Sequence, residues 1–139
     1  MMAAACRTAG LDGGGELIRL GENALFRLAS LPVIMRIARS VEHLAAARKE
    51  VAVSRWPASE GFPAARVVED LEQPLVVDGH PVTFWHLIVE EGRPATYGEL
   101  GGVLRDLRAL ALPDGLELPR YSAFGLSDSS ALHGSIPRR

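Results

Sequence analysis

The chain has 139 residues, enough for one domain with a single hydrophobic core. Hydrophobic residues make up 47% of it and charged residues 23%, as in a soluble globular protein, and the formal net charge of −2 gives no reason to bind nucleic acid or an anionic membrane. No apolar run reaches the roughly 18 residues of a membrane span, and the single cysteine, Cys6, excludes an internal disulfide. We therefore expect a cytoplasmic chain without membrane or nucleic-acid partners.

The N-terminal half of the chain predicts a small antiparallel sheet. Residues 1–15 are small and rich in glycine, which is typical of a flexible leader. Three strand-sized apolar runs follow at 17–20, 25–28 and 33–37, and only tight turns join them. Because no helix lies between these runs, they predict an antiparallel meander and not a parallel sheet.

A helix is predicted over residues 41–60. Ser40 is a suitable N-cap residue, and Glu42 lies in the first turn, where the helix dipole favours an acidic side chain. Pro57 interrupts this pattern, because a proline in a helix interior removes a hydrogen bond and costs about 3 kcal/mol. We expect the helix to end or kink near Trp56.

More strands and a second helix are predicted in the C-terminal half. Residues 65–68, 75–77 and 82–89 read as strands, and Asp78-Gly79 is a good hairpin turn, so the sheet has five or six strands. Thr96 and Glu99 match a capping box ahead of a helix that ends before Pro113. The last stretch, 119–139, has no periodicity and is predicted to be a disordered tail.

The ordered set of local sequences resembles the aminoglycoside phosphotransferase family, which has a protein-kinase-like fold. The resemblance covers residues 16 to 118, and its strength lies in the order of the pieces and not in any single one. The matching segments are the first hairpin at 21–28, the third strand at 33–36, part of the next helix at 48–51, the last strand and hinge at 83–92, and a helix at 100–110.

This resemblance implies an α+β fold of the kinase small-lobe kind. An antiparallel sheet of five to six strands, with one inserted helix, would form a nucleotide-binding lobe at 16–92. The hinge and the first helix of a large lobe, a linker helix, would occupy 93–118. The implied function is ATP-dependent phosphorylation of a small-molecule hydroxyl, with ATP as the nucleotide.

Four residues are candidates for the phosphate end of the site. In the family a short Gly/Asn turn lies over the phosphates, which corresponds to Gly21 and Asn23. Kinase-like folds place a lysine on the third strand that binds phosphates and pairs with a glutamate of the next helix. The only lysine here is Lys49, on the helix, so Arg36 would take that role with Glu50 as its partner.

The residues themselves leave alternatives open at these positions. Gly21 and Asn23 also suit an ordinary turn. Arg36 is the one cation in an apolar strand, but it also suits the exposed face of an edge strand. Glu42 competes with Glu50 as its partner, although its position near the helix start already explains it, and Glu50 itself also suits a solvated helix face.

The resemblance places adenine against the end of the last strand. Backbone groups from Trp85 to Val89, that is Trp85, His86, Leu87, Ile88 and Val89, would bind the base. Phe84 and Trp85 are the aromatic candidates for its pocket. Side chains of neighbouring strand residues point to opposite faces, so at least one of the two belongs to the core.

No residue of this chain is a candidate for the catalytic base or for a metal ligand. The family carries them in a His-Gly-Asp segment and a later aspartate of the large lobe, and neither pattern occurs here, so Mg²⁺ is expected only together with that lobe. We therefore expect the nucleotide-binding part of a phosphotransferase, inactive by itself. The alternative is a non-catalytic module that binds nucleotide or other proteins, including self-association through the surface that a large lobe would cover.

Overall fold

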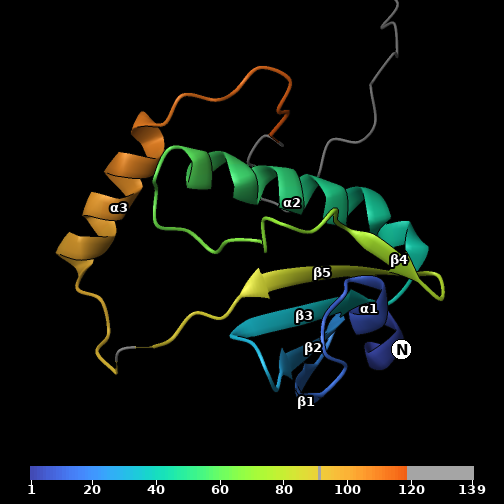
Figure 1. Ribbon diagram of the computed structural model, residues 1–139. Coiled ribbons are helices and arrows are strands. Elements are labelled where there is room, and N and C mark those ends of the chain that lie inside the picture. Colours follow the sequence, from blue (N-terminus) through green and yellow to red (C-terminus); the bar gives the residue numbers. More distant parts are fainter. Residues whose placement is uncertain (91, 119–139) are drawn as a thin grey trace, which may run out of the picture.

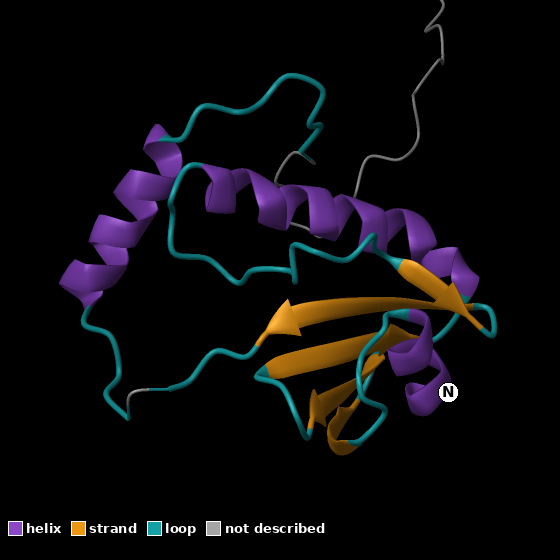
Figure 2. Ribbon diagram, viewed as in Figure 1, coloured by secondary structure: helices purple, strands orange, loops and turns teal. Residues whose placement is uncertain are grey.

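The computed structural model describes residues 1–90 and 92–118, which form an α+β fold with an open antiparallel sheet of five strands and three helices (Figures 1 and 2). The predicted tail at 119–139 lies outside the described residues. In chain order the elements are α1 (Met2–Thr8), β1 (Gly15–Leu20), β2 (Asn23–Leu28), β3 (Val33–Ala38), a 3-10 turn (Val41–His43), α2 (Leu44–Ser59), β4 (Leu75–Val77), β5 (His80–His86) and α3 (Tyr97–Ala109).

The sheet confirms the predicted meander. Its strand order is β1-β2-β3-β5-β4, and each neighbouring pair is antiparallel. Asp78 and Gly79 join β4 to β5 with φ angles of 50° and 79°, the left-handed geometry of a two-residue hairpin turn. Helix α2 enters between β3 and β4, so the polypeptide leaves the meander, crosses the sheet and returns as the β4–β5 hairpin (Figure 1).

The strand predicted at 65–68 does not form. The segment makes a single isolated bridge, Val67 to Trp85, in which the Val68 N–H donates to the Phe84 carbonyl at 3.0 Å and the His86 N–H donates to the Arg66 carbonyl at 2.9 Å. The side chain of Gln73, which is 8% exposed, completes the pairing: its Oε1 accepts the Phe84 N–H at 2.8 Å and its Nε2 donates to the Val68 carbonyl at 2.7 Å. A side-chain amide thus replaces a strand peptide at this edge of β5, which sequence patterning does not reveal.

The leader predicted at 1–15 is also different in the structure. Residues Met2–Thr8 form α1, and Ala5 and Cys6 are completely buried against one face of the sheet. They share a core cluster with alternate residues of β3 and β5, including Met35 and Phe84. The run from Met2 to Cys6 is apolar and forms a helix whose Ala5 and Cys6 are buried, which the high glycine content of 1–15 did not indicate.

Helix α2 lies along the opposite face of the sheet (Figure 2). Its Ala47 and Val51 are buried, and the Ser54 hydroxyl donates to the Ala65 carbonyl at 2.9 Å, which ties the helix to the returning chain. Of the two outcomes expected near Trp56, an end or a kink, the helix does not end there but continues through Pro57 to Ser59. Pro57 lies in the last turn and its ring is buried, so packing offsets the single lost hydrogen bond.

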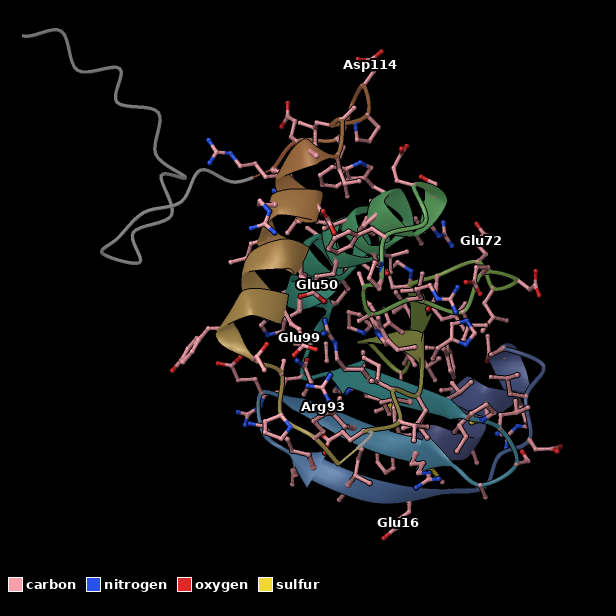
Figure 3. All side chains as sticks on the ribbon, turned by 90° about the vertical axis from the view of Figure 1, so that its left-hand side faces the viewer. Glu16, Glu50, Glu72, Arg93, Glu99 and Asp114 are labelled. Atoms are coloured by element: carbon pink, nitrogen blue, oxygen red, sulfur yellow. The ribbon has the colours of Figure 1, made fainter. Side chains whose placement is uncertain are left out.

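Helix α3 begins as its sequence predicts. The Thr96 hydroxyl accepts the Glu99 N–H at 3.2 Å, the Glu99 carboxylate accepts the Thr96 N–H at 2.8 Å, and the helix ends at Ala109, before Pro113. Glu99 also accepts two hydrogen bonds from Arg93, shown beside it in Figure 3. The apolar side chains of α3 remain exposed: Leu100 is 50% exposed and Leu104 is 56% exposed.

Within the described residues, none of the helices combines the length and the apolarity that a bilayer crossing requires.

The start of α3 should be sensitive to acid. Hydrogen bonds from Arg93, and then from Thr96, lower the pKa of Glu99 to about 2. A lowered folded-state pKa adds stability above the unfolded value near 4.5, and this stability is lost as the pH falls towards about 2. In wild type, the NMR amide signals of 97–109 should report a loss of helix stability as the pH falls. We expect Glu99→Gln to abolish this pH-dependent loss. A Glu117→Gln control should leave that change as in wild type, and an identical acid response of Glu99→Gln and wild type would contradict the cap.

Candidate functional site

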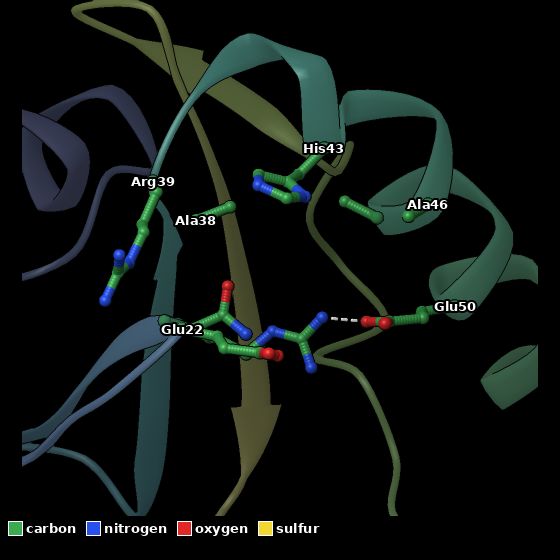
Figure 4. A pocket seen from close by; sticks show the side chains of 9 residues that line it. Glu22, Ala38, Arg39, His43, Ala46 and Glu50 are labelled. Carbon is green, nitrogen blue, oxygen red and sulfur yellow. Dashed lines mark hydrogen bonds and ion pairs between the residues drawn. The ribbon is translucent and has the colours of Figure 1, made fainter. Parts of the chain in front are cut away.

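An ion pair between the sheet and α2 forms the centre of the candidate site. Arg36 projects from the middle of β3, and its Nη2 donates to Glu50 Oε2, fourteen residues later on α2 (Figure 4). The pair predicted from the sequence is therefore confirmed, and Glu42 lies in the 3-10 turn ahead of α2. The side chains are 26% and 46% exposed, so the pair lies at an open rim and not in the core.

The Trp85 ring of β5 packs against the guanidinium of Arg36. The guanidinium carbon lies 5.7 Å from the centre of the Trp85 ring, within the range of a cation–π interaction. The Trp85 Nε1–H donates at 2.9 Å to the hydroxyl of Thr83, a buried residue that lies directly opposite Arg36 in the β3–β5 ladder. Partial burial lowers the pKa of Arg36, because the charged guanidinium loses part of its hydration.

The β1–β2 turn lies next to this ion pair and is held by a second arginine. Both Nε and Nη2 of Arg39 donate to the Gly21 carbonyl, at 3.2 and 2.8 Å. Gly21 does not adopt a left-handed conformation, and a Cβ added there would meet nothing closer than the Arg19 Nε at 4.0 Å. The fold therefore does not require glycine at position 21, although a ligand that approaches the turn closely would.

Two adjoining pockets surround Arg36 and the turn. One, of about 370 Å³, lies between the turn, the end of β3 and α2, and the other, of about 480 Å³, lies along β1 and β2. Both are lined by Glu22, Asn23 and Arg36. The first pocket is also lined by Ala38, Arg39, His43, Ala46, Ala47 and Glu50. The second pocket is also lined by Arg19, Gly21 and Leu25.

A third pocket, of about 600 Å³, extends from Arg36 beneath α2 and is mainly apolar. Its walls include Trp85, Val53 and Pro57, with Lys49 and Glu50 among its charged residues. Arg36 thus lies where a pocket with an aromatic wall meets two pockets that contain arginine side chains together with the Glu22 carboxylate. This arrangement suits a ligand that has a flat apolar part and an anionic part.

The structure separates the residues that were predicted to hold adenine. Phe84 is fully buried in the core while Trp85 faces Arg36, which confirms that strand alternation divides the two aromatic residues. His86 points elsewhere and forms a 2.7 Å pair with Glu69, a hydrogen bond that lowers the pKa of Glu69. Ile88 lines a different pocket, together with 61–66.

Backbone groups near the end of β5 are only partly free. The His86 N–H donates to the Arg66 carbonyl at 2.9 Å, and the Leu87 N–H donates to the Pro32 carbonyl at 2.8 Å. Within the described residues, the Ile88 and Val89 N–H groups have no acceptor, and these two side chains are 67% and 76% exposed. Backbone recognition of a base could therefore use positions 88 and 89, but not the N–H groups of 86 and 87.

Sequence reasoning missed Arg39, Arg19 and His43. Arg39 follows Arg36 by three positions, which in a continuing strand would put the two side chains on opposite faces. The strand ends at Ala38, and the chain turns before the 3-10 helix, so Arg39 is free to reach the β1–β2 turn. The available signal was the strand end marked by Ser40, the residue before the 3-10 turn.

Neither potential metal ligands nor comparisons with known proteins assign a ligand or a family to this chain. Across 1–90 and 92–118 there is no group of three or more His, Cys, Asp or Glu side chains placed to hold a metal ion. No protein-family model matches the chain, and neither a curated protein nor a solved structure matches it significantly.

The Arg36–Glu50 pair can be measured by a double-mutant cycle. Because both side chains are partly exposed, we expect a coupling energy of about 1 kcal/mol in urea unfolding of Arg36→Ala, Glu50→Ala and the double variant, well below the 3–5 kcal/mol of breaking a buried pair. Lys49→Ala, an exposed neighbour on α2, is the control and should show no coupling to Arg36. Equal couplings for Glu50 and Lys49 would show that the pair has no energetic role.

Proposed function

We propose that the chain is a nucleotide-binding lobe of the kinase small-lobe kind, as in aminoglycoside phosphotransferases. In this proposal ATP binds at Arg36, with its phosphates beneath the β1–β2 turn. The parent reaction would be phosphorylation of a small-molecule hydroxyl.

The observation that carries the proposal is the ion pair between Arg36 and Glu50. Protein kinases bind the ATP phosphates with a basic residue of the third strand, which a glutamate of the next helix holds in position. Here the third strand carries Arg36, the next helix carries Glu50, and the two side chains are paired. The order of elements supports the same proposal, since three antiparallel strands, a helix, a hairpin and a final helix follow one another.

Arginine in place of the usual lysine is compatible with this role. Trp85 offers a flat surface on which a guanidinium stacks more readily than an ammonium group. One guanidinium has five N–H donors, so Arg36 can bond Glu50 and still offer donors to a phosphate. The proposed site thus binds phosphate with the planar guanidinium of Arg36, where kinases use the ammonium group of a lysine.

The sizes and chemistry of the pockets suit a nucleotide. The apolar pocket of about 600 Å³ with Trp85 could take the base, and the two pockets of about 370 and 480 Å³ offer cationic donors for phosphates. Arg36 borders all three. Transfer of the phosphoryl group needs a base and Mg²⁺ ligands, for which this chain has no candidate, so we propose that it binds ATP without turning it over.

ATP should stabilise the wild-type chain and not the Arg36→Ala variant. At about ten times the dissociation constant, binding adds about 1.4 kcal/mol, which raises the Tm of a domain of this size by several degrees. Arg27→Ala removes the same charge from an exposed site on β2 and is the matched control. Equal ATP-dependent shifts for Arg36→Ala and Arg27→Ala would refute the phosphate role of Arg36, and measurable ATP turnover by the chain would show that catalytic residues were overlooked.

A second candidate function is protein interaction through α3. Its exposed apolar residues, Leu100, Val103, Leu104 and Leu107, form one helix face that no described element buries. In this proposal the face binds a second copy of the chain. Sedimentation velocity should then show dimers that Leu104→Glu dissociates, whereas Arg105→Glu leaves them intact. A wild-type chain that is monomeric at about 100 μM would exclude self-association.

A further inference from the structure

Arg39 contacts the part of the β1–β2 turn that the proposed phosphates would approach. It is the first residue after β3, and both Nε and Nη2 donate to the carbonyl oxygen of Gly21, eighteen positions earlier. A guanidinium that gives two N–H groups to one oxygen is held by its planar shape, so this contact has a defined direction. Arg39 itself has a largely exposed side chain and is not part of the core.

The contact fixes the orientation of a whole peptide unit. The Gly21–Glu22 peptide is trans, and in a planar trans peptide the C=O and N–H groups point in opposite directions. When Arg39 holds the Gly21 carbonyl, the Glu22 N–H must therefore point away from Arg39. Within the described residues, this N–H has no hydrogen-bond acceptor.

The turn has little else to hold it. A glycine has more accessible backbone conformations than any other residue, and the space around Gly21 is open. The Gly21 N–H donates to the Asn23 carbonyl at 3.1 Å, which leaves the next peptide without a backbone bond of its own. Arg39 is therefore the group that selects one orientation of this peptide.

Glu22 and Gly21 both line the pocket of about 480 Å³ that contains Arg36, and Arg39 lines only the other of the two pockets. We infer that Arg39 is a positioning residue: it holds the turn so that the Glu22 N–H, together with Arg36, receives a phosphate oxygen of the nucleotide. A backbone N–H at a turn is a suitable anion ligand because its hydrogen carries a partial positive charge that the turn can direct at the anion. This inference rests on the proposed function.

The inference predicts an effect confined to ligands with phosphate. We expect Arg39→Ala to weaken ATP binding about tenfold in isothermal titration calorimetry, the cost of one charged hydrogen bond, and to change adenosine affinity less than about twofold. Arg39→Lys should recover part of the loss, because an ammonium donates to the same carbonyl with less directional control. Arg27→Ala, which removes an exposed charge of β2, should leave both affinities unchanged.

A measurement without ligand isolates the turn itself. In ¹H–¹⁵N spectra of the free protein, the chemical shift of the Glu22 amide should change in Arg39→Ala and should equal the wild-type value in Arg27→Ala. An unmoved Glu22 amide in Arg39→Ala overturns the inference whatever the ligand binding. So does an equal loss of ATP and adenosine affinity, which would indicate a general effect on the fold.

The two proposals fail in different ways. ATP binding by wild type with unchanged affinity in Arg39→Ala overturns the role of Arg39 and leaves the nucleotide site in place. No binding of ATP by wild type overturns the proposed function, and the role of Arg39 with it. If Arg39→Ala does not fold, Arg39→Lys provides the same comparison of ATP with adenosine.

Discussion

The charge of Arg36 within an apolar strand is the constraint on which the site depends. Arg36 stands among valine, isoleucine and methionine in β3, and its side chain is 26% exposed, so part of the guanidinium's hydration is replaced by contacts with the protein. Glu50 supplies the opposite charge from α2, and Trp85 supplies a flat surface from β5. A strand, the helix that follows it and a strand more than forty residues later thereby meet at one guanidinium, and the three pockets of the candidate site all border it.

Polar side chains complete the small sheet where the backbone alone does not. The Gln73 amide pairs with the edge of β5, and the Ser54 hydroxyl both donates to Ala65 and accepts the Val67 N–H. These contacts hold the irregular chain of 65–73 against α2 and β5, and they place Val67 opposite Trp85. On the other face of the sheet, Ala5 and Cys6 of α1 are buried in the hydrophobic core, so the core and the candidate site lie on opposite faces.

Local sequence patterns predicted most of the strands and helices. The features that they failed to predict depend on contacts between residues far apart in the sequence. Alternation and turn chemistry predicted β1 to β3 and the Asp78-Gly79 hairpin, and the capping box predicted the start of α3, because these signals act over a few residues. The strand expected at 65–68 was replaced by a single bridge, since a side chain eleven residues before Phe84 took the ladder bond. The burial of α1 likewise depends on a sheet that forms later in the chain. In the site, the resemblance suggested Arg36 and Glu50, whereas it has no counterpart for Arg39, and the strand end at Ala38 does not by itself say which group eighteen residues away the Arg39 side chain contacts.

The most direct test of the account is a nucleotide titration of the ¹⁵N-labelled chain followed at individual residues. If Arg36 binds the phosphates, ATP should move the Arg36 Nε–H signal and the amides of 21–23 in a saturable way, with a smaller change at the Trp85 indole N–H. Adenosine should move the indole signal and leave the amides of 21–23 unchanged, because it lacks the phosphates that the turn would bind. Saturable ATP shifts confined to α3 or to 61–66, with Arg36 and the turn unchanged, would contradict the account and place any nucleotide elsewhere.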